Sequence, residues 1–228
     1  MPRLIDYAEF AMYLPQHFSH ADRALALAAM RENPFAILIS TSTDNEPFAT
    51  HAPLAVDERG RELVIVGHIA RANPHSQLIG LGEPVLAIFS GPHAYISPSN
   101  YDTREAVPTW NYIAVHAYGE PRLITDPVAK DASQKRLIAD HEPQYAAHWR
   151  SLDPGYQTKM LEGITVFEIP VRRLEAKFKL IQNRPEGDRA RVYHRQRAGS
   201  QDERGLAQWM ERVGAVPPAA RLPPTTPS

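Results

Sequence analysis

The sequence contains no cysteine, and this absence removes several chemistries at once. Disulfide bonds, thiolate nucleophiles and cysteine-bound zinc are excluded, and such a composition suits a reducing cytosol. No run approaches the roughly 18 apolar residues that a membrane-spanning helix requires. Residues 1–18 lack a continuous apolar stretch after a basic start, so they do not form a secretory signal. We therefore expect a cytoplasmic protein with no membrane partner.

Charge of one sign is also scarce, because 25 lysines and arginines oppose 26 acidic residues and leave a formal net charge of −1. This balance argues against a protein that mainly coats nucleic acid, while a local basic patch stays open. The length of 228 residues and a hydrophobic content of 43% fit a globular domain with a real core. We predict a single domain over residues 1–213, helical from about 184 to 213. The five prolines in residues 215–228 predict a disordered tail over 214–228.

Familiar catalytic signatures are missing as well. The sequence has no GxGxxG, GxxxxGK[ST], GxSxG or HExxH pattern, which mark dinucleotide, nucleotide, hydrolase and zinc sites. His68 and His75 have no third ligand at a diagnostic spacing, so we expect no metal site.

Short apolar runs separated by turn residues are frequent. They predict strands over residues 35–41, 48–56, 62–68, 84–91, 93–99, 111–124 and 164–180. Helical patterns occupy residues 19–33 with Ser19 as N-cap, 126–149 with a break near Pro143, 156–161, 188–196 and 201–213. Strands this close together, with helices at the margins, predict a mainly β fold: an antiparallel barrel with peripheral helices.

The stretch GHIARANPH (67–75) joins the end of a predicted strand to the start of a helix, with Asn73 as cap and Pro74 at the first position. Free N–H groups at a helix start attract an anion, and Arg71 adds a bidentate donor. A solvated surface turn explains the same residues, so both interpretations stay open.

Polar and aromatic side chains stand out in two further places. Thr50 and His51 interrupt the apolar run FATHAPL, either as satisfied core groups or as the polar edge of a ligand site. Aromatic residues with polar handles cluster between residues 91 and 112, where a planar ligand pocket and a dimer interface explain them equally well. These aromatic residues are Tyr95, Tyr101, Trp110 and Tyr112.

A basic region, residues 172–197, spans the end of the last predicted strand and the segment after it. It holds nine lysines and arginines against three acidic residues, a local excess of six positive charges. Such asymmetry suggests an anionic partner, which could be a cofactor phosphate, a second subunit or DNA. A solvated and partly paired surface is the alternative.

Six blocks of the sequence, in order, resemble the PaiB family, whose members are known as FMN-binding negative transcriptional regulators. The similarity extends over about residues 12–213, and VPTWNY together with GHxARANPH is a specific combination. The blocks are YLPQHF (13–18), FATHAPL (48–54), GHIARANPH (67–75), GPHAYISPSNY (91–101), VPTWNYIAVHAYG (107–119) and KFKLIQNR (177–184). The resemblance implies an FMN-binding split β-barrel of the flavin-reductase and pyridoxamine-phosphate-oxidase type. It also implies a homodimer with FMN at the subunit interface.

The resemblance further implies roles for individual residues. Arg71 and the backbone of Ala72 and Asn73 would hold the FMN phosphate. The residues that would line the flavin are Thr50, His51 and His68. Those that would approach the isoalloxazine ring are Trp110 and Asn111, and those that would complete a polar ring are Lys179, Gln182 and Arg184. Asn100 stands where the family pattern has an aromatic residue, which would open the outer lip of the pocket unless Tyr101 compensates.

Three functions stay open from the sequence. The first is a dimeric flavoprotein with FMN-dependent oxidoreductase activity, since a flavin carries its own redox chemistry. The second is a transcriptional regulator, whose only physical support in the sequence is the basic region, residues 172–197. The third is a haem- or flavin-sequestering protein without catalysis or direct DNA binding, with His51, His68, His93 and His116 as candidate axial ligands of a haem.

Overall fold

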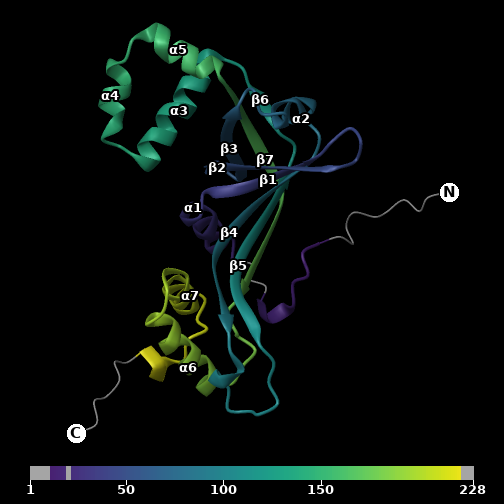
Figure 1. Ribbon diagram of the computed structural model, residues 1–228, viewed down its shortest axis with the longest axis vertical. Coiled ribbons are helices and arrows are strands. Elements are labelled where there is room, and N and C mark those ends of the chain that lie inside the picture. The colour runs from purple at the N-terminus through teal and green to yellow at the C-terminus, as the bar shows by residue number, and fades with distance from the viewer. Residues whose placement is uncertain (1–10, 19–21, 222–228) are drawn as a thin grey trace, which may run out of the picture. The chain divides into compact units, whose positions relative to one another are not determined.

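A computed structural model describes residues 11–18 and 22–221 of the chain (Figure 1). Seven strands form a mainly antiparallel sheet in the order β3-β2-β1-β4-β5-β7-β6, and an additional pairing of β3 with β7 closes it into a barrel. The strands are β1 (Phe35–Thr41), β2 (Pro47–Arg59), β3 (Glu62–Ala70), β4 (Val85–Ile96), β5 (Thr109–Gly119), β6 (Arg122–Ile124) and β7 (Ile164–Lys179). The prediction of a mainly β fold built on an antiparallel barrel is confirmed.

The helices follow the predicted helical segments closely. They are α1 (Arg23–Glu32), α2 (His75–Leu81), α3 (Pro127–His141), α4 (Tyr145–Ser151), α5 (Pro154–Glu162), α6 (Glu186–Arg197) and α7 (Gln201–Arg212). Short 3-10 turns are η2 (Gln16–Phe18), η3 (Pro98–Asn100) and η4 (Pro218–Arg221). Within the part of the chain that the structure describes, no helix is long and apolar enough to cross a membrane.

Internal contacts divide the chain into two compact units, whereas the sequence predicted a single domain over residues 1–213. Unit 1 comprises Met1–Ala29, Ser90–Val115 and Glu175–Ser228. Unit 2 comprises Met30–Phe89 and His116–Leu174. Strands β4, β5 and β7 contribute residues to both units, which is why the sequence showed no linker between them.

Unit 2 contains the closed part of the sheet. In β1 every second side chain is buried, as the pleat of a strand requires, so Ala36, Leu38 and Ser40 face inward. β1 pairs with β2 so that Leu38 lies opposite Thr50, and β3 pairs with β7 so that Gly67 lies opposite Phe167. Helices α3, α4 and α5 follow one another as a separate arch in Figure 1.

Unit 1 is organised by two C-terminal helices, α6 and α7, which lie side by side (Figure 1). Ser200 begins α7 with a capping box, in which its hydroxyl accepts from the Glu203 N–H and the Glu203 carboxylate accepts from the Ser200 N–H. Trp209 of α7 packs against Phe178 of β7 with ring centroids 5.4 Å apart. This contact buries the end of β7 under the helices.

The first part of the segment predicted to be a disordered tail has defined structure. Ala215, Val216 and Ala220 are buried, and Pro218–Arg221 forms a 3-10 turn. The prediction of disorder from residue 214 is therefore wrong for residues 214–221, because apolar residues between the prolines pack onto unit 1. Residues 222–228 lie outside the described residues.

Two local predictions also need correction. Gly91-Pro92 was expected to separate two strands, but β4 runs through it without a break. A Cβ at Gly91 would lie 3.0 Å from the Ile113 Cβ, so the glycine permits close approach of β5 and makes no turn. The predicted N-cap Ser19 lies outside the described residues, and the carboxylate of Asp22 accepts from the Ala24 N–H at 2.8 Å at the start of α1.

Candidate functional site

The predicted cofactor residues divide between the two units. Those in unit 2 are Thr50 and His51 on β2, His68 on β3, and Arg71, Ala72 and Asn73 in the turn that leads to α2. Those in unit 1 are Trp110 and Asn111 on β5, Lys179 at the end of β7, and Gln182 and Arg184 between β7 and α6.

The turn after β3, residues 70–73, is called the Arg71 turn and is tied down through its backbone. The Asn73 N–H donates to Ala70 O at 2.9 Å, which closes a β-turn, and the Arg71 N–H donates to Gly163 O at 2.9 Å. Arg71 itself is exposed, and its guanidinium makes no hydrogen bond or ion pair with any described residue. A fixed backbone with a free guanidinium suits the binding of an anion.

The start of α2 offers an anion less than the sequence predicted. The Asn73 side chain does cap it, because Asn73 Oδ1 accepts from the His75 N–H at 2.9 Å. The Ser76 N–H donates to Asn73 O at 2.9 Å, and the Asn73 N–H is used within the turn. These bonds use the Asn73 N–H, one of the two backbone donors that were expected to hold a phosphate, and leave the Ala72 N–H and the Arg71 side chain as the anion donors of this turn.

A buried polar network lies behind the Arg71 turn. His75 is fully buried, and its Nε2 lies 2.8 Å from Ser40 Oγ while its Nδ1 lies 2.9 Å from Thr50 Oγ1. Asn73 Nδ2 donates to the same Thr50 oxygen at 3.3 Å. Burial lowers the pKa of His75, so the imidazole is neutral near pH 7. The structure thus brings together Thr50 and Asn73, two of the predicted residues.

The other two histidines predicted to line a flavin have different surroundings. His68 is half-buried on β3, and burial lowers the pKa of its imidazole. His51 is exposed and stacks on Phe35 with ring centroids 6.0 Å apart. Of the two interpretations, that of satisfied core groups fits Thr50, which is half-buried and bonded to Asn73 and His75, and does not fit exposed His51, because adjacent strand residues point to opposite faces.

Unit 1 exposes a group of aromatic side chains, called the aromatic face and made of His93, Tyr95 and Trp110. The Trp110 ring lies 6.1 Å from Tyr95 in an edge-on arrangement and 6.2 Å from His93. Tyr95 and Trp110 are each 52% exposed, which is unusual for rings of this size. Such a face fits the stacking of a planar ligand or the approach of a second subunit.

Asn111 follows Trp110 on β5 and points the other way. It is fully buried, and neither its amide nitrogen nor its amide oxygen has a hydrogen-bond partner among the described residues. Because no surface of the side chain is accessible, a ligand resting on the aromatic face would not reach this amide. An internal water is the usual partner for such a group.

Three predicted polar residues at the end of β7 already have partners within unit 1. Lys179 Nζ donates to Thr109 Oγ1 at 2.6 Å, and the Arg184 guanidinium lies over the Tyr101 ring at 4.3 Å. Gln182 Oε1 accepts from the Leu180 N–H at 2.8 Å, and its Nε2 donates to Phe178 O at 2.5 Å. Gln182 therefore stabilises the turn in which buried Ile181 takes a positive φ of 55°. Tyr101 is buried, so it does not form the outer lip that would compensate for Asn100.

The basic region, residues 172–197, is engaged mostly within the chain. A central group joins η3 to α6, where buried Asp188 accepts from the Asp102 N–H at 3.0 Å and pairs with Arg191. Further contacts are Arg172 with Glu120 at 2.5 Å, Arg173 over the Tyr118 ring at 3.7 Å, Lys177 with Tyr13 O at 2.7 Å, Arg189 with Ala215 O at 3.1 Å and Arg191 with Asp102 at 2.8 Å. The interpretation as a partly paired surface is therefore favoured over a free anion-binding patch.

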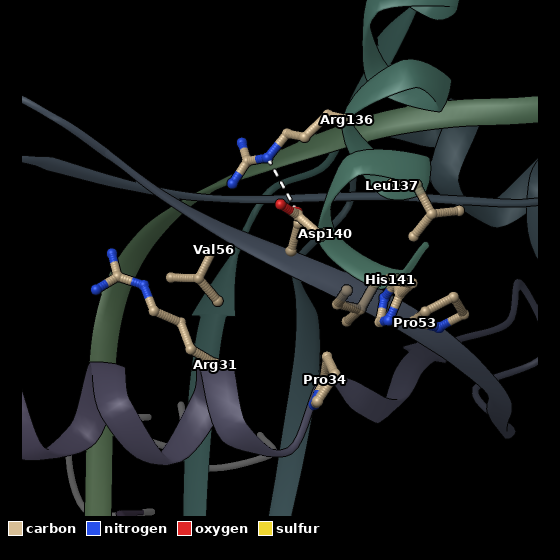
Figure 2. Close-up of a pocket in the computed structure, with 10 residues that line it drawn as sticks. Arg31, Pro34, Pro53, Val56, Arg136, Leu137, Asp140 and His141 are labelled. Atoms are coloured by element: carbon tan, nitrogen blue, oxygen red, sulfur yellow. Dashed lines mark ion pairs between the residues drawn. The ribbon is translucent and has the colours of Figure 1, made fainter. Parts of the chain in front are cut away.

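A cavity of about 330 Å³ in unit 2 involves other residues (Figure 2). Its lining comes from α1, β2, α3 and Pro34, and its cations are already paired. Arg31 contacts Glu58 at 2.8 Å, and Arg136 contacts Asp57 and, at 3.4 Å, Asp140. Because these pairs neutralise the arginines, the cavity is a weaker candidate for a phosphate than Arg71.

The sequence did not predict that Ser40 and His75 form a buried hydrogen bond. Ser40 appeared as one polar residue inside an apolar strand, and His75 appeared only as an incomplete metal ligand. Their contact joins residues 35 positions apart, so it depends on the register of β1 and the placement of α2. The one available signal was a polar residue at an inward position of an otherwise apolar strand.

Comparisons with known proteins identify the family and the fold. Residues 12–173 match the family model described as "Putative FMN-binding domain". The chain is 36% identical over 207 residues to the "Protease synthase and sporulation protein PAI 2" of Bacillus subtilis, which covers 88% of this chain and 97% of that relative.

Solved structures with a similar fold are more distant in sequence. The flavocytochrome Anf3 from Azotobacter vinelandii has a TM-score of 0.54 and 16% identity, covering 71% of this chain and 69% of its own. The FAD and haem binding protein from Mycobacterium smegmatis has the same score and identity, covering 71% and 73%. These likenesses concern the fold alone, which is the predicted split barrel. The family model and the Bacillus relative go further: the chain belongs to the PaiB family of FMN-binding domains.

Proposed function

We propose that the chain binds FMN as a homodimer and that Arg71 holds the phosphate of the cofactor. The observation that carries this proposal is an exposed arginine without a described partner on a turn fixed by its own backbone. A guanidinium presents parallel N–H donors that match phosphate oxygens, and its charge persists at any physiological pH. The family of FMN-binding domains supplies the chemical identity of the anion.

Each unit, taken by itself, also offers groups that suit a flavin. Half-buried His68 is neutral near pH 7, because burial lowers its pKa, and it offers a hydrogen-bonding edge without a buried charge. The aromatic face of unit 1 offers exposed rings to a planar group. A bound flavin supplies hydride and electron transfer, and the protein binds and orients it.

The homodimer is part of the same proposal and rests on the aromatic face. Two large rings, each 52% exposed, are an expected feature of the core of a subunit interface. We expect light scattering to give twice the mass of one chain, and Trp110→Asp to shift the mass toward one chain. A wild-type mass of a single chain at micromolar concentration would contradict this part of the proposal.

The sharpest test of the phosphate site is Arg71→Ala. We expect the variant to lose about 1.5–3 kcal/mol of FMN affinity, the usual contribution of a hydrogen bond to a charged group. Affinity for riboflavin, which lacks the phosphate, should change little. Quenching of flavin fluorescence measures both, and the absorption spectrum of the purified protein with and without added FMN establishes the cofactor first.

Two controls make the result specific. Arg71→Lys keeps the charge but loses the parallel donors, so its FMN affinity should lie between those of wild type and Arg71→Ala. Arg150, exposed in α4, is the matched control, and Arg150→Ala should leave both affinities unchanged. Equal losses for FMN and riboflavin in Arg71→Ala would remove Arg71 from the phosphate site. A wild-type protein that binds no flavin would end the proposal.

Neither alternative function gains a comparable observation. Direct DNA binding would need free cations, and in the basic region, residues 172–197, most cations already contact other groups of the chain. Arg172, Arg189 and Arg191 are paired with carboxylates. For haem, the same absorption spectrum decides, because a Soret band is distinct from the near-ultraviolet and blue bands of a flavin.

A further inference from the structure

We propose that His75 positions the Arg71 turn, so that the preference of this chain for a phosphorylated flavin depends on a side chain that is out of the flavin's reach. This inference rests on the proposed function and adds to it a positioning residue behind the phosphate site. His75 is fully buried, so it acts only through its neighbours.

The two nitrogens of the His75 ring join two strands. Nε2 lies 2.8 Å from Ser40 Oγ on β1, and Nδ1 lies 2.9 Å from Thr50 Oγ1 on β2. Phe48 packs its ring edge-on against the imidazole with centroids 5.2 Å apart, which restricts rotation of the ring. Contacts from both strands therefore fix the position and the orientation of the His75 ring.

Asn73 connects His75 to the Arg71 turn. Asn73 Nδ2 donates to Thr50 Oγ1 at 3.3 Å, and Asn73 Oδ1 accepts from the His75 N–H at 2.9 Å. Both ends of the Asn73 amide are thus fixed by His75 or by its partner. Asn73 closes the turn through its own N–H, which donates to Ala70 O, and Arg71 is the second residue of that turn.

One assignment of donors and acceptors satisfies all three side-chain hydrogen bonds, with each donor pointing from Asn73 toward Ser40. Asn73 donates to Thr50 Oγ1, which leaves the Thr50 hydroxyl free to donate to His75 Nδ1, and Nε2–H then donates to Ser40 Oγ. Each group in this chain has a partner, so the network favours one arrangement of the turn. Removing the imidazole takes away the acceptor of the Thr50 hydroxyl, so Thr50 can rotate away from Asn73 Nδ2, and only the backbone N–H of residue 75 still holds the Asn73 amide. The Arg71 turn is then held less firmly.

The first experiment uses the protein without any flavin. Trypsin cleaves after exposed arginines in mobile backbone, so the rate of cleavage after Arg71, followed by mass spectrometry, reports how firmly the turn is held. We expect His75→Leu to raise this rate at least tenfold relative to cleavage after Arg150, a reference site in α4. Ser40→Ala is the matched control: it breaks the far end of the network but leaves Thr50 and Asn73 joined, and its ratio should stay within about twofold of wild type.

The second experiment measures FMN and riboflavin affinities of the same variants. In His75→Leu we expect FMN affinity to fall about tenfold, the change that corresponds to one charged hydrogen bond, and riboflavin affinity to fall much less. His75→Asn can place its amide oxygen near the position of Nδ1, where it accepts from the Thr50 hydroxyl, so it should restore most of the preference for FMN. His75→Gln places its amide group near Nε2, out of reach of Thr50, and should restore little.

The outcomes separate this inference from the proposed function. Cleavage after Arg71 that rises equally in His75→Leu and Ser40→Ala would overturn the positioning role, whether or not flavin binds. A loose turn in His75→Leu with unchanged preference for FMN would also overturn it. If wild type binds no flavin while the cleavage pattern is as expected, the proposed function fails and the role of His75 in holding the turn stands.

Discussion

The Arg71 turn with the network behind it is rich in polar groups, and so is the contact between α6 and the residues around η3. The two regions use these groups in opposite ways. Behind the Arg71 turn, buried Ser40 and His75 and half-buried Thr50 and Asn73 form an uncharged network, while the charge of Arg71 is exposed without a described partner. Between η3 and α6, buried Asp188 draws in Arg191 and the Asp102 N–H, so the charges are consumed by the structure itself. A count of charges along the sequence therefore does not show which region holds a cation without a described partner.

The difference shows what an anion site needs. An arginine that already has a carboxylate partner must give it up before it binds phosphate, and an arginine on loose backbone must be ordered when it binds. Arg71 avoids both costs, because its backbone is fixed and its head is free. The basic region, residues 172–197, has nine cations but uses most of them to hold the helices and β7 in place.

Asp188→Ala should have the largest effect on stability and separates the two regions. Asp188 is 1% exposed, and its loss leaves Arg191 and the Asp102 N–H without their common acceptor. We expect the free energy of unfolding, measured in urea, to fall by about 2–3 kcal/mol. FMN affinity of the folded variant should be unchanged, which is the reverse of the result expected for Arg71→Ala.

Glu186 provides the control within the same first turn of α6. Its carboxylate is 75% exposed and lies 3.6 Å from Arg189, so Glu186→Gln should change the unfolding free energy by less than about 0.5 kcal/mol. If Asp188→Ala were as mild as Glu186→Gln, the charges of this segment would not be structural, and its arginines would again be candidates for an external anion.

The sequence predicted those features that depend on local pattern. The apolar run FAILIST predicted β1 at residues 35–41, and Pro143 marked the break between α3 and α4. It failed where the cause lies elsewhere in the chain. Gly91 has the residue type of a turn, but its role depends on Ile113 of β5, and the role of His75 depends on the registers of β1 and β2. The exposure of Arg71 on a turn follows from local sequence, and its role as a phosphate ligand stays a prediction.

The smallest predicted effect is the change of the unfolding free energy with pH, and it arises from His75 behind the Arg71 turn and from His68 on β3. Burial lowers the pKa values of His68 and His75 below 6.5, so the unfolded chain takes up protons near pH 6.5 while the folded chain resists them. Stability is then full above about pH 6.5 and falls as the pH drops toward the lowered pKa values. The slope should approach about 1.4 kcal/mol per pH unit for each histidine that stays neutral.

Urea unfolding between pH 7.5 and 5.0 measures this slope, and His75→Asn should reduce it by about half because His68 still contributes. The side chains that contact His75 from β1, β2 and the turn are Ser40, Phe48, Thr50 and Asn73, which are uncharged, so burial is the cause being tested. An unchanged slope in His75→Asn would mean that the imidazole takes up a proton as readily in the folded protein as in the unfolded chain, and burial would then not lower its pKa.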